Sequence, residues 1–464
     1  MQKKIVIICV GILILNVMLA YKPHLTYPYP MNGDEFSHIA WAKLVLEEGK
    51  LPFKNPYIDS STKIPNYEFG FHLILAFLFW LLPGDPVLIF KFLKVGFIVI
   101  NSLLLFYFLK VYFKEDYIAL LGMAFFGMIP NTQDLLGNNY LIAMTAGISF
   151  LLLGGILLHK ITKIRLFAFS ITMILLAVTY PPFFIFSMLV HGIFRYKELY
   201  DYISKNRLVL LSCIILAGGG ILAVLHIGIN KFIFPLTWTP IDAKYSPVFF
   251  FFVPFLFAII GLKKCIKFKQ WLPLIWSGLS LGLIYFYYLF SFSILIPFQR
   301  ACMLYFIGIS ILAGVGMGKL FIEYKNFAPF LILIMIIPFA HAWTSTPKPI
   351  PILNENTYMA LLYIKDNVEK DAIVASDSLT SIAIYPVTGN HILSMLASNL
   401  HAYDSRGTID FLNANCTRKI EYINKMNSLG LMKSNHYFLL KEKSECDFFE
   451  PVYLKGPYLY KYTV

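Results

Sequence analysis

An acidic pair and a histidine follow the first apolar segment of the chain, where residues 32–38 read NGDEFSH. The pattern predicts a helix that continues to Glu48. Asp34, His38 and Trp41 are spaced i, i+4 and i+7, so they share one face of that helix. A carboxylate and an imidazole on one face can accept a proton from a substrate hydroxyl and hold the base in place. The alternative is structural, because acidic residues in a first turn also complement the helix dipole.

A second carboxylate, Asp134, lies in a polar stretch between two apolar segments, at residues 131–134. Together with Asp34 it makes a pair that can bind a divalent metal or orient the hydroxyls of a sugar. Nothing in the spacing requires a metal, so Asp34 and Asp134 remain candidate ligands only. The alternative for Asp134 is a loop carboxylate that is simply solvated.

Arg300 stands at the end of an apolar segment and is the third candidate. Its guanidinium is well suited to binding the phosphate of an anionic lipid, although an arginine in such a place also snorkels to the interface. Glu68 and His72 are further candidates for substrate binding, because they open the apolar segment 69–82.

The composition places these residues in a membrane protein. Of the 464 residues, 58% are hydrophobic and only 14% are charged, whereas a soluble domain usually has about 25% charged residues. The net charge of +13 comes from short Lys and Arg clusters between apolar runs. This is the positive-inside pattern of a protein with many spans, and it argues against nucleic-acid binding.

The positions of the basic clusters predict the topology. The apolar segments are 5–20, 69–82, 88–110, 117–130, 140–159, 165–179, 182–194, 208–229, 247–262, 271–290, 301–319 and 327–343. From a cytoplasmic N-terminus, all basic clusters fall inside only if one early segment does not cross. Segment 69–82 is the best candidate, because about fourteen apolar residues are short for a span. We therefore expect about eleven transmembrane helices, with an outside loop at 21–87 that contains the non-spanning helix.

The two ends of the chain carry further expectations. An uncleaved signal-anchor explains the N-terminus better than a cleaved signal peptide, because later segments span repeatedly. The tail 345–464 alternates short helices and strands, which predicts a small α/β domain outside the membrane. The expected domains are therefore 1–344 and 345–464. Cys416 and Cys446 are plausible disulfide partners if the tail faces an oxidising compartment, and the pairing stays open.

Several short motifs together resemble the GT-C class of polytopic glycosyltransferases, which is related to protein O-mannosyltransferases and aminoarabinose transferases and depends on polyprenyl-phosphate sugars. Asp34-Glu35 looks like the acidic pair of that family's first outside loop. Asp134 matches the place of its second-loop acid, and Arg300 that of a basic residue that contacts lipid phosphate. Residues 66–68 depart from the family, because Asn-Tyr-Glu stands where a Tyr-Pro-Pro type sequence is common.

The resemblance implies an inverting transfer of a sugar from a polyprenyl-phosphate donor to a glycan, lipid or protein acceptor on the outer face of the cell membrane. Asp34 or Glu35 would be the base, and Arg300 would stabilise the leaving phosphate. Two other classes remain open. A transporter or flippase of lipid-linked glycan usually places ionisable residues near the midplane, and here the acids gather at one surface. A non-catalytic membrane scaffold is the third.

Overall fold

The computed structural model describes residues 2–58, 66–131, 135, 137–198, 233–235, 251–324, 326, 328–346, 348–392, 415–428, 436–441 and 443–462. Within these residues, four helices are long and apolar enough to cross a membrane: Lys3–Leu25, Pro86–Phe113, Trp271–Phe290 and Phe298–Glu323. The chain is an integral membrane protein. The predicted number of about eleven spans is not confirmed, and the predicted span 208–229 lies outside the described residues.

Contacts divide the chain into two units. The helical unit contains Met1–Pro23 and Lys94–Pro347, and the loop-and-tail unit contains His24–Leu93 and Lys348–Val464. The predicted division of the chain into domains 1–344 and 345–464 stays a prediction. The contacts group the first loop, His24–Leu93, with the tail, Lys348–Val464, in one unit. The predicted division is linear and contains no such grouping.

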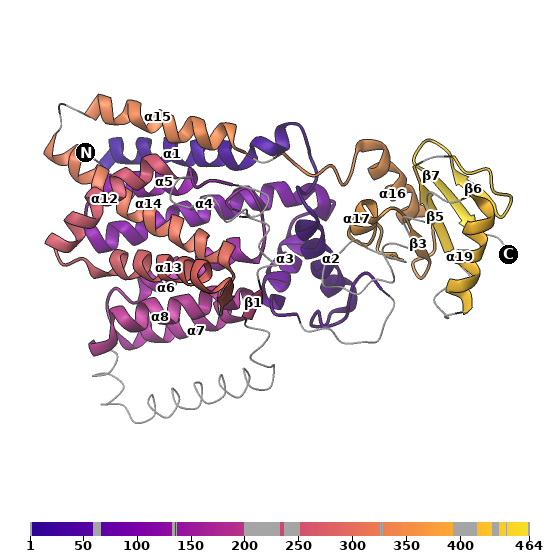
Figure 1. Cartoon of the computed structure of the whole chain (residues 1–464), viewed down its shortest axis with the longest axis horizontal. Coiled ribbons are helices and arrows are strands. Elements are labelled where there is room, and N and C mark those ends of the chain that lie inside the picture. Colours follow the sequence, from indigo (N-terminus) through magenta and orange to yellow (C-terminus); the bar gives the residue numbers. More distant parts are fainter. Residues whose placement is uncertain are drawn as a thin grey trace, which may run out of the picture. The chain divides into compact units, whose positions relative to one another are not determined.

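Long apolar helices dominate the helical unit (Figure 1). They are α1 (Gln2–Tyr21), α4 (Pro86–Phe113, which begins in the other unit), α5 (Asp116–Gly127), α6 (Ala143–Leu157), α7 (Lys163–Thr179), α8 (Pro181–Phe194), α12 (Phe252–Lys267), α13 (Trp271–Phe290), α14 (Phe298–Glu323) and α15 (Ala328–Thr344). A short antiparallel pair joins β1 (Ile233–Pro235) to β2 (Phe292–Ile294).

Helix α14 lies at the centre of this unit and packs against α5, α12 and α13. Its residues from Ala301 to Gly318 are all buried. Small residues allow the close approach: a Cβ on Gly316 would collide with the backbone of Phe257, and a Cβ on Gly314 with the backbone of Gly122. Apolar helices in lipid associate in this way, through packing of small residues rather than through hydrophobic exclusion of water.

Buried amides connect the outer helices. Asn16 of α1 donates to the hydroxyl of Ser102 on α4 and to the carbonyl of Met123 on α5, both at 3.1 Å. Asn101 of α4 donates to the carbonyl of Thr145 on α6 at 2.9 Å. Each such bond satisfies a polar group that would be costly to bury alone.

The loop-and-tail unit combines helices with one sheet (Figure 1). Its helices are η1 (Lys22–Leu25, which begins in the helical unit), α2 (Gly33–Glu48), α3 (Phe69–Leu81), α16 (Glu355–Asn367), α17 (Ser378–Thr388) and α19 (Cys416–Ser428). Its strands are β3 (Ile373–Ala375), β4 (His391–Ile392), β5 (His436–Leu440), β6 (Phe449–Tyr453) and β7 (Tyr458–Tyr462). The sheet order is β4-β3-β5-β7-β6, and β3 is parallel to both of its neighbours while β7 is antiparallel to both of its own. This sheet and its helices agree with the predicted α/β tail.

The first loop packs against the tail within this unit, mainly through α2 and α17. Lys43 of α2 donates to the carbonyls of Tyr385, Pro386 and Val387, the last of them at 3.2 Å. These carbonyls lie in the last turn of α17, where most lack a donor within the helix; that of Tyr385 also accepts the N–H of Gly389. Burial lowers the pKa of Lys43 to about 8, and the neighbouring Glu47 opposes that shift. The lysine thus caps a tail helix from the first loop.

Candidate functional site

A network of side-chain caps fixes the N-terminus of α2. The side chain of Asn32 accepts the backbone N–H of Glu35 at 3.0 Å, and the Glu35 carboxylate accepts that of Met31 at 2.6 Å. This is a variant of the capping box, in which the acidic residue reaches back beyond the helix start. Glu35 is fully buried. Its carboxylate therefore has a structural task at this helix end.

Asp34 differs from its neighbour, because its side chain is exposed in the first turn of α2. The helix N-terminus favours its ionised form. Tyr57 lies near this carboxylate, since Asp34 adds to the rise in the pKa of Tyr57 that burial causes. Tyr57 itself donates to the carbonyl of Ile382 on α17 at 3.1 Å. Of the acidic pair, Asp34 is the member that an external substrate can reach.

Replacement of Glu35 by Ala is expected to lower the free energy of unfolding by about 1–3 kcal/mol, because the buried N–H of Met31 loses its acceptor. Differential scanning fluorimetry of the purified protein would measure this as a lower Tm. Glu48→Ala is the matched control, because its carboxylate sits in an exposed ion pair with Lys54. Equal Tm values for the two variants would contradict the capping role of Glu35.

Three predicted site residues come together between α2 and α3: His38, Glu68 and His72. Nδ1 of His38 lies 2.9 Å from Nε2 of His72, and Nε2 of His38 lies 4.0 Å from Oε2 of Glu68. Their potential ligand atoms all lie within 4.8 Å of one another. By residue type, two imidazoles and a carboxylate suit either a transition metal or hydrogen bonding to a polar substrate.

Aromatic rings enclose the two histidines. Trp41 stacks on His72 with ring centroids 5.8 Å apart, and Phe71 meets His38 edge-on at 5.0 Å. Helix α3 is not among the candidate spans, and its apolar face buries His72. Burial, and to a lesser extent His38, hold the pKa of His72 well below its ordinary value. His72 is therefore neutral at physiological pH.

The helical unit contains Arg300, in the first turn of α14. Its Nη1 donates to the carbonyl of Leu135 at 3.4 Å. Leu135 follows Asp134 in the sequence, and Asp134 itself lies outside the described residues. Asp34 belongs to the other unit, so the predicted convergence of Asp34, Asp134 and Arg300 on one cavity stays a prediction, as does a metal between the two carboxylates.

Two residues that make contacts at the site or next to it were not predicted from the sequence. Asn66 hydrogen-bonds His72, and Lys43 caps α17. In the sequence, Asn66 stands out only because residues 66–68 differ from the Tyr-Pro-Pro type sequence that is common in the family. A lysine on the apolar side of α2 was a weak signal, because lysine is common on exposed helix faces.

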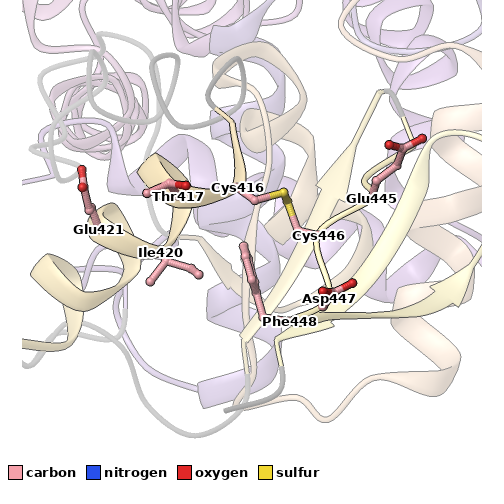
Figure 2. A pocket seen from close by; sticks show the side chains of 8 residues that line it. All are labelled: Cys416, Thr417, Ile420, Glu421, Glu445, Cys446, Asp447 and Phe448. Carbon is pink, nitrogen blue, oxygen red and sulfur yellow. A yellow bond between two sulfur atoms is a disulfide. The ribbon is translucent and has the colours of Figure 1, made fainter.

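A surface pocket lies elsewhere in the loop-and-tail unit, around a disulfide between Cys416 and Cys446. Figure 2 shows the bond linking α19 to the segment before β6, with acidic side chains at the rim. The lining residues are Cys416, Thr417, Ile420, Glu421, Glu445, Cys446, Asp447 and Phe448. None of them is a predicted site residue. The disulfide does settle the pairing that the sequence left open.

Comparison with known proteins gives a likeness of fold. No protein-family model and no curated protein sequence matches the chain. A crystal structure of the Archaeoglobus fulgidus oligosaccharyltransferase in complex with Zn and sulfate matches with a TM-score of 0.56 and 11% identity, over 92% of this chain and 67% of that one.

Two further oligosaccharyltransferase structures from Archaeoglobus fulgidus match as well. One is tethered to an acceptor peptide with an NVT sequon (TM-score 0.55, 12% identity, 93% and 68% coverage). The other contains an inhibitory peptide and a dolichol-phosphate (TM-score 0.56, 11% identity, 93% and 69% coverage). At such identities the likeness establishes the fold, and nearly the whole chain takes part in it. The chain thus shares its fold with an archaeal oligosaccharyltransferase, a membrane glycosyltransferase of the GT-C class.

Proposed function

We propose that this protein is a membrane glycosyltransferase that moves a sugar from a polyprenyl-phosphate donor to an acceptor hydroxyl. The observation that carries the proposal is the likeness of fold over 92% of the chain to an oligosaccharyltransferase. A structure of an oligosaccharyltransferase from the same organism contains dolichol-phosphate, which is a polyprenyl lipid of the proposed kind. One fold hosts many functions, so the proposal depends on the site residues as well.

Asp34 is the proposed base. It accepts the proton of the acceptor hydroxyl while that oxygen attacks the anomeric carbon of the donor sugar. The new carbon–oxygen bond forms on the face opposite the bond to phosphate, which breaks and leaves its electron pair on the lipid phosphate. Inversion follows from this geometry. The exposed position of Asp34 in a first helical turn supports the choice over Glu35, whose carboxylate is buried and holds the N–H of Met31.

The reaction is proposed to take place on the outer face of the membrane. The disulfide between Cys416 and Cys446 supports this location for the loop-and-tail unit, which also contains Asp34. Disulfides persist in oxidising compartments and are rare in the cytosol. The acceptor is proposed to be a glycan, lipid or protein that is exposed there.

The test is an assay of the purified protein in detergent with polyprenyl-phosphate-linked sugars, following the release of polyprenyl phosphate. We expect one of these donors to be consumed with transfer of its sugar. In sealed vesicles, movement of the intact donor across the membrane without cleavage of the sugar–phosphate bond would instead identify a transporter and refute the proposal.

Arg300 is proposed to stabilise the charge that grows on the leaving phosphate. Arg300→Ala should lower kcat/KM for the lipid donor about 10–150-fold, the loss expected for a hydrogen bond to a charged group. Arg300→Lys should lose less, because it keeps the charge without the bidentate fork. Donor titrations of the three proteins would measure this order. Equal activity in Arg300→Ala and the parent protein would exclude the role.

A further inference from the structure

The orientation of the Asn66 amide is fixed by its two backbone partners. Its Nδ2 donates to the carbonyl of Pro52 at 3.0 Å, and its Oδ1 accepts the N–H of Glu68 at 3.1 Å. If the amide were turned over, its oxygen would face the Pro52 oxygen and its nitrogen would face the Glu68 N–H. Both contacts would then be repulsive, so Asn66 has only one satisfied orientation.

This orientation determines which nitrogen of His72 carries the proton. The same Nδ2 of Asn66 lies 2.9 Å from Nδ1 of His72. Nδ2 is a donor, so Nδ1 of His72 must be the acceptor and cannot carry a proton. A neutral imidazole then carries its single proton on Nε2.

The position of the proton on His72 in turn determines the position of the proton on His38. Nε2 of His72 lies 2.9 Å from Nδ1 of His38. Because Nε2 of His72 is the donor, Nδ1 of His38 is the acceptor, and the proton of a neutral His38 sits on Nε2. That nitrogen faces the carboxylate of Glu68 at 4.0 Å. The chain of hydrogen bonds therefore directs an N–H donor toward a carboxylate acceptor.

The distance of 4.0 Å between these atoms is too long for a direct hydrogen bond and suits one that is bridged. A hydroxyl oxygen at about 2.9 Å from each atom spans this distance with an angle of roughly 90° at the oxygen. Such an oxygen accepts the N–H of His38 and donates its own proton to Glu68. The side chain of Glu68 is 35% exposed and that of His38 11%, so the pair can be reached from outside.

We propose that His38 and Glu68 form a subsite for one hydroxyl group of a sugar, with His72 and Asn66 as positioning residues that keep the His38 proton on Nε2. The neighbouring Trp41 is buried, and its indole stacks on His72 and so helps to hold that imidazole in place. The inference rests on the proposed glycosyl transfer, because it specifies which group of a transferase substrate the first loop recognises.

A metal site on the same three residues is the competing explanation. A metal needs the lone pair of His72 Nε2, and the remaining nitrogen of a ligating histidine donates its N–H to an acceptor. Here Nδ1 of His72 faces the Asn66 N–H donor. The hydrogen bonds thus place protons where a metal would require lone pairs, which favours the hydroxyl subsite.

Two substitutions of His72 distinguish the hydroxyl subsite from the metal site. The two explanations predict opposite rankings of the variants His72→Gln and His72→Glu in sugar transfer and in bound metal. Gln carries an N–H near the place of the histidine Nε2–H, so His72→Gln preserves the donor to His38 but is a poor metal ligand. Glu presents only acceptors, so His72→Glu reverses the chain but supplies a metal-binding carboxylate. The full-length protein in detergent would be compared in sugar transfer, in bound zinc and manganese, and in saturation-transfer NMR with methyl glycosides as probes. Equal Tm values would establish that both variants fold.

The hydroxyl subsite predicts that kcat/KM falls about tenfold or more in His72→Glu and that His72→Gln restores most of it. The saturation-transfer signal of the methyl glycosides should likewise be weaker with His72→Glu than with His72→Gln. Zinc that is bound by the parent protein, lost in His72→Gln and retained in His72→Glu would overturn the proposal. So would equal transfer and equal glycoside saturation in both variants. If the parent protein transfers no sugar but its glycoside saturation still depends on His72, the proposed reaction fails and the subsite stands.

Discussion

Asp34→Asn is expected to lower kcat for sugar transfer by about 10²–10⁴-fold, the usual contribution of a general base. The amide keeps the shape of the side chain and its place in the first turn of α2, but it cannot take a proton from the acceptor. Because the side chain is exposed, folding should change little. Transfer from the lipid donor and the Tm would be measured on the same preparations.

Glu48→Gln is the matched control for this experiment. It also neutralises an exposed carboxylate on α2, and it removes only the exposed ion pair with Lys54. We expect its activity to equal that of the parent protein, since exposed ion pairs contribute little. Sugar transfer by Asp34→Asn at the rate of the parent protein would exclude Asp34 as the base. The likeness of fold to the oligosaccharyltransferase would not be affected.

The second large effect is expected from the disulfide in the tail. Cys416 and Cys446 are 30 residues apart in the sequence, and the bond closes a loop that contains α19 and β5. The double variant Cys416→Ser/Cys446→Ser should lose about 2–4 kcal/mol of stability, because its unfolded tail regains chain entropy. The side of the sheet core around Ile423, Phe438 and Phe449 should open first. Hydrogen exchange of β5 and β6 would report this loss.

Cys9→Ser is the control for general effects of cysteine removal, because Cys9 is unpaired and belongs to the other unit. Treatment of the parent protein with a reductant should reproduce the behaviour of the double variant. If reduced and oxidised protein exchange hydrogen equally fast throughout β5 and β6, the bond contributes nothing to the stability of the tail.

Much of the secondary structure was predictable from local pattern. The apolar segment 271–290 became α13 with the same bounds, and the predicted alternation of short helices and strands in the tail became α16, α17, α19 and the sheet. In the tail helices, local signals such as capping residues and the glycine after α17 indicate the element, so neighbouring residues decide the outcome. Asn354 and Asp377, for example, cap the N-termini of α16 and α17 with their side chains. The number of eleven spans does not follow from local pattern in the same way, because it depends on which segments cross the bilayer.

The candidate site was predictable only in part, because its geometry depends on contacts between distant segments. His38 and His72 were each named from the sequence, but their direct hydrogen bond joins residues 34 positions apart. The role of Asn66 depends on the backbone of Pro52 and Glu68, which no residue pattern reveals. Glu35 looked equivalent to Asp34 in the sequence. Only the path of the backbone at Met31 separates a capping carboxylate from an exposed one.

The capping of α17 by Lys43 has a consequence for the order in which the protein matures. Residues 94–347 are synthesised between the two halves of the loop-and-tail unit. Glu48 at the end of α2 and Thr388 at the end of α17 are 340 positions apart (388 − 48). At about 5–20 residues per second, α2 therefore emerges roughly 17–68 s before α17. During that interval α2 has α3 to pack against but lacks α17. In a chain that is cut short before the tail, α2 would still pack against α3 but would lack its contacts with α17.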